Sequence, residues 1–113
     1  MINIENAKKV FREYIKNYDL NYGKIALKVA HILRVSSISK RIAIALNLNE
    51  EDINLAELIG LLHDIGRFEQ VKKFNTFVDK DSINHGEYGV KILFDNGLIR
   101  EFIATDRFDE IIK

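Results

Sequence analysis

Proline is absent from the whole 113-residue chain, and apolar residues recur three and four positions apart in one segment after another. This spacing is the period of an α-helix and not that of a β-strand. The chain is also of a length that suits one domain with a single buried core. We therefore predict an all-α fold, in which residues 1–113 form one compact helical bundle.

The apolar pattern divides the chain into several predicted helices. A first stripe runs from Ala7 to Tyr18, and helical spacing from Ile25 to Leu46 indicates either one long helix or two. A third, almost wholly apolar helix begins at Glu50, where a run of acidic residues suits a helix N-terminus, and we expect Gly66 to end it. Residues Arg67 to Ile83 are predicted to form an irregular loop, after which helical spacing returns.

Charge and cysteine content exclude several classes of function. Seventeen Lys and Arg residues balance seventeen Asp and Glu residues with no run of one sign, so we expect no nucleic-acid partner and no membrane partner. The N-terminus has no signal-like pattern and no apolar stretch approaches the roughly 20 residues that span a bilayer, so we expect a cytoplasmic protein. Because cysteine is absent, any metal must be bound by imidazole and carboxylate groups.

All three histidines lie on the apolar sides of predicted helices. His31 begins a stripe at helical spacing that continues through Val35, Ile38 and Ile42. Its imidazole is therefore predicted to point into the interior. His63 and Asp64 leave the apolar helix at its end, and His85 precedes the apolar residues of the next helix. A buried ionised carboxylate such as Asp64 is costly unless it is paired, hydrogen-bonded or bound to a metal ion.

Inward-facing imidazoles beside a carboxylate would form such a metal site. These ligand types suit divalent Mn, Fe, Zn, Mg, Ni or Co, and the sequence does not choose among them. A divalent ion lowers the pKa of bound water and polarises a phosphoryl oxygen, which are the two requirements of phosphoester hydrolysis. Each residue taken alone also has a structural explanation, as a hydrogen-bonded core histidine or as a helix terminus formed by His63 and Asp64.

The ten residues from Leu61 to Gln70, LLHDIGRFEQ, resemble the central motif of the HD-domain metal-dependent phosphohydrolases. The spacing back to His31 is similar to the spacing to that family's first histidine. The segment HGEYG, which begins at His85, resembles the additional histidine motif of HD proteins that hold more than one metal ion. The resemblance covers about Ile25 to Ile103 and implies an all-α HD-domain bundle that hydrolyses a phosphate ester or anhydride.

The resemblance also implies roles for individual residues. His31, His63 and Asp64 would be metal ligands, and His85 would bind a second ion or the substrate phosphate. Arg67 directly follows the His-Asp pair and could clamp a phosphate, or it could be an exposed cation at a helix end. Asp64 and Arg67 are thus the candidate catalytic residues, and the implied substrate is a phosphorylated small molecule such as a nucleotide. The alternative function is a non-catalytic signalling or binding module that keeps the HD scaffold.

In the HD family the last metal ligand is an aspartate on a later helix. The late aspartates of this chain, Asp106 and Asp109, are better explained as capping and surface carboxylates. An apolar stripe begins at Phe108 and is unfinished at Lys113. We therefore expect the domain to continue beyond this chain, the site to be incomplete, and exposed apolar surface to favour self-association.

Overall fold

The computed structural model describes residues 2–113, which form helices joined by turns and contain no β-strand. The first half of the chain forms four helices: α1 (Ile4–Ile15), α2 (Gly23–Ala45), α3 (Glu50–Leu62) and α4 (Gly66–Phe74). The second half forms shorter ones: the 3-10 helix η1 (Asp79–Asp81), α5 (His85–Phe94), α6 (Ile99–Phe102) and α7 (Asp109–Ile112). The prediction of an all-α fold is confirmed. None of the helices described is long and apolar enough to cross a membrane.

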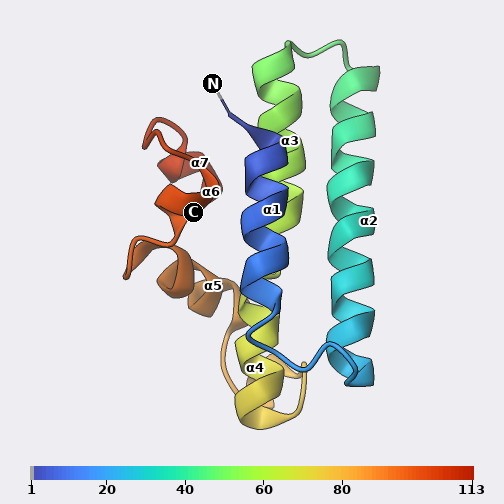
Figure 1. Ribbon diagram of the computed structural model, residues 1–113, viewed down its shortest axis with the longest axis vertical. Coiled ribbons are helices and arrows are strands. Elements are labelled where there is room, and N and C mark those ends of the chain that lie inside the picture. The colour runs from blue at the N-terminus through green and yellow to red at the C-terminus, as the bar shows by residue number, and fades with distance from the viewer. Residues whose placement is uncertain (1) are drawn as a thin grey trace.

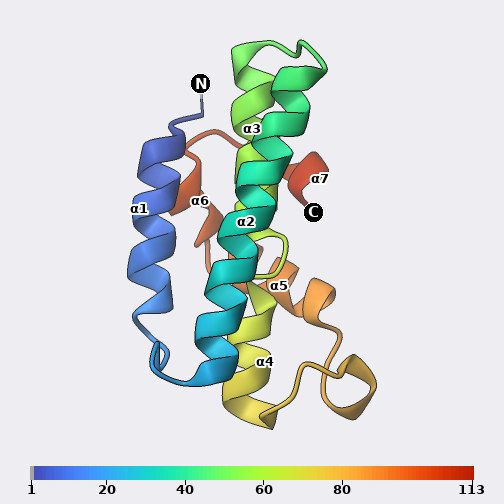
Figure 2. The ribbon, with the colours of Figure 1, turned by 90° about the vertical axis from the view of Figure 1, so that its right-hand side faces the viewer.

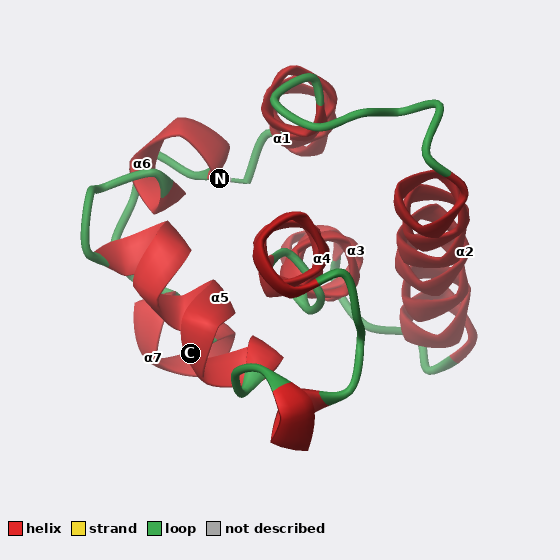
Figure 3. Cartoon of the chain, turned by 90° about the horizontal axis from the view of Figure 1, so that it is seen from below, coloured by secondary structure: helices red, strands yellow, loops and turns green. Residues whose placement is uncertain are grey.

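Helices α3 and α4 follow each other along one axis at the centre of the molecule (Figures 1 and 3). α2 packs along α3 and reaches α4, α1 contacts α3 and α6, and α5 packs on α4. Figure 2 shows the same arrangement from the side, with α2 in front of α3 and α4 in line with α3. The helix that the sequence marks as most apolar therefore lies between the others, as its composition requires.

Asparagine side chains start three of these helices. Asn3, Asn49 and Asn84 each accept a hydrogen bond from the backbone N–H three residues further on, at 2.8–3.0 Å. Such a cap satisfies one of the backbone donors that have no partner inside the helix. Asn75 ends α4 in the left-handed conformation, with φ of 53°, and Asn47 has φ of 58° just after α2. The helix boundaries are thus set largely by asparagine, which tolerates this conformation better than most residues.

The predicted end of the central helix at Gly66 is wrong. α3 ends at Leu62, residues 63–65 form a turn, and Gly66 begins α4. The reason for glycine here is close packing: a Cβ atom on Gly66 would lie 2.3 Å from the backbone oxygen of His85. The predicted loop from residue 67 to 83 is likewise helical as far as Phe74, and the irregular part, interrupted by η1, begins at Asn75.

α2 is a single helix, which resolves the choice between one and two. Its buried residues are Ile25, Ile32, Ser36 and Ala43. The stripe predicted to face inward is therefore misplaced, since Ile38 and Ile42 are 44% and 55% exposed. Apolar residues surround α2 on most sides, so the sequence period alone does not identify the face that packs on α3. His31 lies next to Ile32 at the edge of the buried face and is partly exposed.

Candidate metal centre

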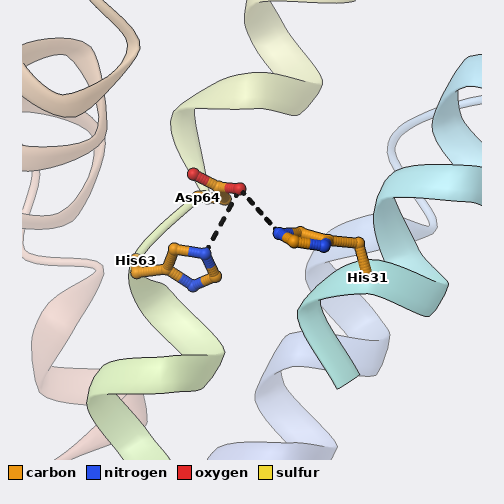
Figure 4. Close-up of side chains that lie close together, drawn as sticks. All are labelled: His31, His63 and Asp64. Atoms are coloured by element: carbon orange, nitrogen blue, oxygen red, sulfur yellow. Dashed lines mark ion pairs between the residues drawn. The ribbon is translucent and has the colours of Figure 1, made fainter. Parts of the chain in front are cut away.

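The turn between α3 and α4 places His63 and Asp64 opposite His31 of α2. Figure 4 shows the two imidazoles, one from each chain segment, pointing toward the same oxygen of the carboxylate. The Asp64 Oδ2 atom lies 3.3 Å from His63 Nε2 and 3.6 Å from His31 Nε2. One ligand atom from each residue lies within 4.8 Å of the other two. Three of the four residues that the sequence suggested as metal ligands thus form one tight cluster.

The imidazole of His63 is oriented by the helix that ends beside it. Its Nδ1–H donates to the backbone oxygen of Gly60, at 2.6 Å, in the last turn of α3. With the hydrogen on Nδ1, the lone pair of the neutral ring is on Nε2, the atom that faces Asp64. The hydrogen bond with Asp64 raises the pKa of His63, although burial opposes the shift. A backbone carbonyl on the second nitrogen is a usual support for a metal-binding histidine.

Asp64 is the buried acid of the site, with 6% of its surface exposed. Burial acts to raise the pKa of its carboxyl group, but the hydrogen bond from His63 and the positive charges around it outweigh burial and lower the pKa. One of these charges is Lys28, whose Nζ atom lies 3.4 Å from Asp64 Oδ2. Lys28 was not predicted, although it precedes His31 by three residues and so shares its side of the helix. Asp64 is therefore a carboxylate kept ionised by its neighbours.

The His31 imidazole is more exposed than the carboxylate, with 40% of its side-chain surface accessible. Desolvation lowers the pKa of His31, and the nearby positive charge of Lys28 lowers it further. Both effects favour the neutral ring, which is the form that binds a metal ion.

His85, at the start of α5, faces the other oxygen of the same carboxylate. Its Nε2 atom lies 3.4 Å from Asp64 Oδ1, and its Nδ1 atom lies 2.8 Å from Asp79 Oδ2. It is not part of the three-residue cluster formed by His31, His63 and Asp64. His85 therefore lies beside Oδ1 of Asp64, whereas His31 and His63 lie beside Oδ2.

Arg67 is held mainly by the segment that follows α4. Its Nη1 atom donates to the backbone oxygen of Phe77 at 2.7 Å, to Gln70 Oε1 at 3.0 Å and to Asp79 Oδ1 at 3.1 Å. Its Nε atom is buried without a hydrogen-bond partner among residues 2–113 and lies 4.0 Å from Asp64 Oδ1. Nη1 of the guanidinium group thus holds the loop, while Nε lies on the side of Asp64.

Asp79 is a second neighbour of the site that sequence reasoning missed. It follows α4 by five residues and has no helical spacing to any histidine, so no local pattern identifies it. Hydrogen bonds from His85 and Gln70 lower the pKa of Asp79 to about 2. It belongs to a hydrogen-bonded group that also includes Arg67.

The central residues fit a divalent metal ion. Bonds of about 2.0–2.2 Å from one ion place neighbouring ligand atoms roughly 3.0–3.5 Å apart in tetrahedral or octahedral geometry. The observed separations between Asp64 Oδ2 and the two imidazole nitrogens, 3.3 and 3.6 Å, are close to this range. Of the late aspartates, Asp109 pairs with Arg100 and Asp106 is exposed, so neither joins the cluster.

A sequence model of a protein family, described as HD domain, matches residues 29–113. The matched range runs from within α2 to the last residue and contains His31, His63, Asp64 and His85. No curated protein and no solved structure is similar enough to this sequence to count as a match.

Proposed function

The chain belongs to the HD-domain family of metal-dependent phosphohydrolases, and from this premise we propose that it hydrolyses a phosphate ester or anhydride of a small molecule such as a nucleotide. The observation that carries the proposal is the convergence of His31, His63 and Asp64 from two separate parts of the chain. A bound divalent ion supplies Lewis acidity toward a phosphoryl oxygen and lowers the pKa of water.

His31, His63 and Asp64 hold the ion in this proposal. The hydrogen bond to Gly60 directs His63 Nε2 toward Asp64, and the lowered pKa of Asp64 keeps its carboxylate ionised, as metal binding needs. A bound ion would take the place of the proton whose binding to His63 is favoured by Asp64. The two oxygens of Asp64 face different sides, Oδ2 toward His31 and His63, and Oδ1 toward His85. This division supports a role for His85 at a second ion or at the phosphate of the substrate.

Two cationic residues beside the carboxylate would hold the anionic substrate. Lys28 Nζ lies 3.4 Å from Asp64 Oδ2 and 4.9 Å from the centre of the Phe77 ring. Once a metal ion balances the charge of Asp64, the Lys28 ammonium group is free to pair with a phosphate oxygen. Arg67 is the second cation: its buried Nε lies 4.0 Å from Asp64 Oδ1, so its positive charge would favour a phosphate bound beside that carboxylate.

The test combines metal content with turnover. The purified chain is analysed for bound metals and assayed on p-nitrophenyl phosphate and a set of nucleotides, with Mn²⁺, Zn²⁺, Fe²⁺, Mg²⁺, Ni²⁺ or Co²⁺ added. We expect weak metal binding and slow metal-dependent hydrolysis, because neither late aspartate joins the three-residue cluster, and we expect both to be lost in Asp64→Asn. The matched control is Asp95→Asn, which makes the same change at an exposed position at the end of α5.

Three outcomes are informative. Metal binding with hydrolysis, sensitive to Asp64→Asn and not to Asp95→Asn, supports the proposal. Metal binding without hydrolysis of any substrate points instead to a non-catalytic binding module built on the same scaffold. Failure of the chain to bind any of the ions overturns the metal site itself.

A further inference from the structure

The carboxylate of Asp79 lies where α4, η1 and the start of α5 meet. Its Oδ2 atom is 2.8 Å from His85 Nδ1 and 3.4 Å from the backbone nitrogen of the same residue. Its Oδ1 atom is 2.9 Å from Gln70 Nε2 and 3.1 Å from Arg67 Nη1. One carboxylate therefore binds both the side chain and the backbone of His85 while two residues of α4 hold it in place.

These contacts fix the orientation of the carboxylate. Gln70 is fully buried, and its amide donates to Ser82 Oγ as well as to Asp79. Arg67 also donates to the backbone of Phe77, so both partners connect α4 to the segment between residues 75 and 84. Neither can turn away from Asp79 without losing other hydrogen bonds. The position of Asp79 is thus set by α4, which directly follows the turn that carries Asp64.

The hydrogen bond that Asp79 accepts from His85 also determines which ring nitrogen of His85 keeps its lone pair available. An ionised carboxylate only accepts hydrogen bonds, and Asp79 lies closer to Nδ1, at 2.8 Å, than Asp64 lies to Nε2, at 3.4 Å, so the hydrogen of the neutral imidazole is placed on Nδ1. The lone pair is then on Nε2, which lies 3.4 Å from Asp64 Oδ1. A histidine that ligates a metal commonly donates its second N–H to a carboxylate in this way.

Asp81, two residues further along the same 3-10 helix, provides the contrast. It is exposed, and its side chain makes no hydrogen bond or ion pair with any of residues 2–113. The two acids carry the same charge and lie on the same short element. They differ in that only Asp79 touches His85.

We infer that Asp79 is a positioning residue: it holds His85 in the tautomer and orientation that direct Nε2 toward Asp64, and so prepares His85 for the ion or phosphate bound there. The inference rests on the proposed function for what His85 binds. The orientation of His85 itself does not depend on that function, because it is set by contacts within the chain.

The first measurement tests the tautomer in the metal-free protein. Long-range ¹H–¹⁵N spectra resolve the ring nitrogens, and the chain has only three histidines, so the His85→Ala spectrum assigns the signals of His85. At a pH where His85 is neutral, we expect the Nδ1–H form in the unmodified chain and in Asp81→Ala. In Asp79→Ala we expect the population to move toward Nε2–H. An unchanged tautomer in folded Asp79→Ala overturns the inference.

The second measurement is Mn²⁺ titration by calorimetry. His85→Ala identifies the binding step that uses His85, and Asp79→Ala should weaken that step by about 10- to 100-fold, as changes to residues behind a metal ligand do. Asp81→Ala removes the same charge without removing a contact to His85, so it should change the Mn²⁺ affinity of that step by no more than about twofold if the contact, and not the net charge, causes the weakening. Equal weakening in both variants would overturn the positioning role.

A third variant covers a loss of folding in Asp79→Ala. Asp79→Asn keeps the shape of the side chain but has one acceptor oxygen in place of two. With that oxygen on Gln70 and Arg67 its NH2 group faces His85 Nδ1, and with the oxygen on His85 it is only a neutral acceptor. We expect it to fold, with a smaller population of Nδ1–H and weaker Mn²⁺ binding than the unmodified chain. Full retention of both properties would count against the inference. If no form of the chain binds Mn²⁺ while Asp79 still controls the tautomer, the proposed function fails and the positioning role stands.

Discussion

Gly66 is the position where the smallest change to the chain should disturb both packing and metal binding. It begins α4 directly after the turn that carries Asp64, and it lies against the first residues of α5. In Gly66→Ala the new Cβ atom would lie 2.3 Å from the backbone oxygen of His85 and 2.9 Å from the backbone nitrogen of Gly89. Both neighbours are backbone atoms, so no side-chain rotation can relieve the contact.

The size of the effect follows from these distances. Ordinary contacts of a Cβ atom begin at 3.4 Å, so the His85 carbonyl must move away by about 1 Å. Overpacking of this kind costs about 1–3 kcal/mol. Replacing glycine by alanine in a helix returns at most about 1 kcal/mol, and less at the first position of a helix. We expect a net loss of about 1–2 kcal/mol in the free energy of unfolding, which corresponds to roughly 5–15 °C in Tm for a domain of this size.

The same displacement should affect the metal site, because the atom that must move belongs to His85. Metal-ligand distances are tolerated within about 0.2 Å, so a shift of about 1 Å should cost most of what His85 contributes to binding. Urea and thermal unfolding measure the stability, and Mn²⁺ titration measures the affinity. Gly86→Ala is the matched control, since its Cβ would meet only the Asn84 side chain at 3.4 Å and lies in the same helix as His85. If Gly66→Ala is as stable as Gly86→Ala and binds Mn²⁺ equally well, the close approach of α4 and α5 is not as described.

Three further changes test other parts of the structure. Asp64→Ala should abolish metal binding, measured by elemental analysis, and should lower the urea midpoint of the metal-free chain moderately, because the neighbours that lower the pKa of Asp64 stabilise its charge in the folded state and lose this partner in the variant. Unfolding at room temperature would show that its structural role dominates. Lys8→Met should lower the free energy of unfolding by about 3 kcal/mol, measured in urea, because it leaves a buried carboxylate without its nearest cation. Glu57 is 3% exposed and lies 2.9 Å from the Lys8 ammonium group, and in the variant its remaining cationic neighbour is Lys40 at 3.8 Å. The hydrogen bond with Glu57 raises the pKa of Lys8, so the stabilisation by this pair is complete below the ordinary value of 10.5 and is lost as the pH rises through the higher pKa of the folded state. If the stability difference between the unmodified chain and Lys8→Met stays the same well above pH 10.5, the Lys8–Glu57 ion pair is not its cause. Asn47→Val should lower the free energy of unfolding by about 1–2 kcal/mol, because φ is 58° at this position and valine rarely adopts that conformation, whereas Asn47→Gly should cost little. Thermal unfolding compares the two variants, and equal losses would refute the backbone explanation.

The chemistry of the candidate site was largely predictable from the sequence. Without cysteine the choice of ligands falls on imidazole and carboxylate, and the His63-Asp64 pair at the end of an apolar helix identifies the place. His31 was found by its spacing in an amphipathic pattern, although the stripe chosen for it is mostly exposed. Its contact with Asp64 arises because α2 packs along α3 and reaches α4.

Two neighbours of the site, Lys28 and Asp79, were not predicted from the sequence. Lys28 has a helical spacing to His31, so its side of α2 could be inferred, but its closeness to Asp64 depends on how α2 packs against the turn after α3. Asp79 has no such signal, because it lies in an irregular segment that is held by Gln70 and Arg67. Its role depends on side-chain contacts across the α4–α5 connection, which no periodicity records.

The sequence by itself determined the helical class and the types of side chain available to bind a metal ion, because periodicity and residue chemistry act over a few neighbouring residues. The tertiary structure decided which face of α2 is buried and why residue 66 is glycine. Several faces of α2 are apolar enough to be buried, and only contact with α3 selects one of them. Glycine is compatible with both the end and the beginning of a helix, and at position 66 the deciding factor is the backbone of α5, which passes within contact distance of its Cα.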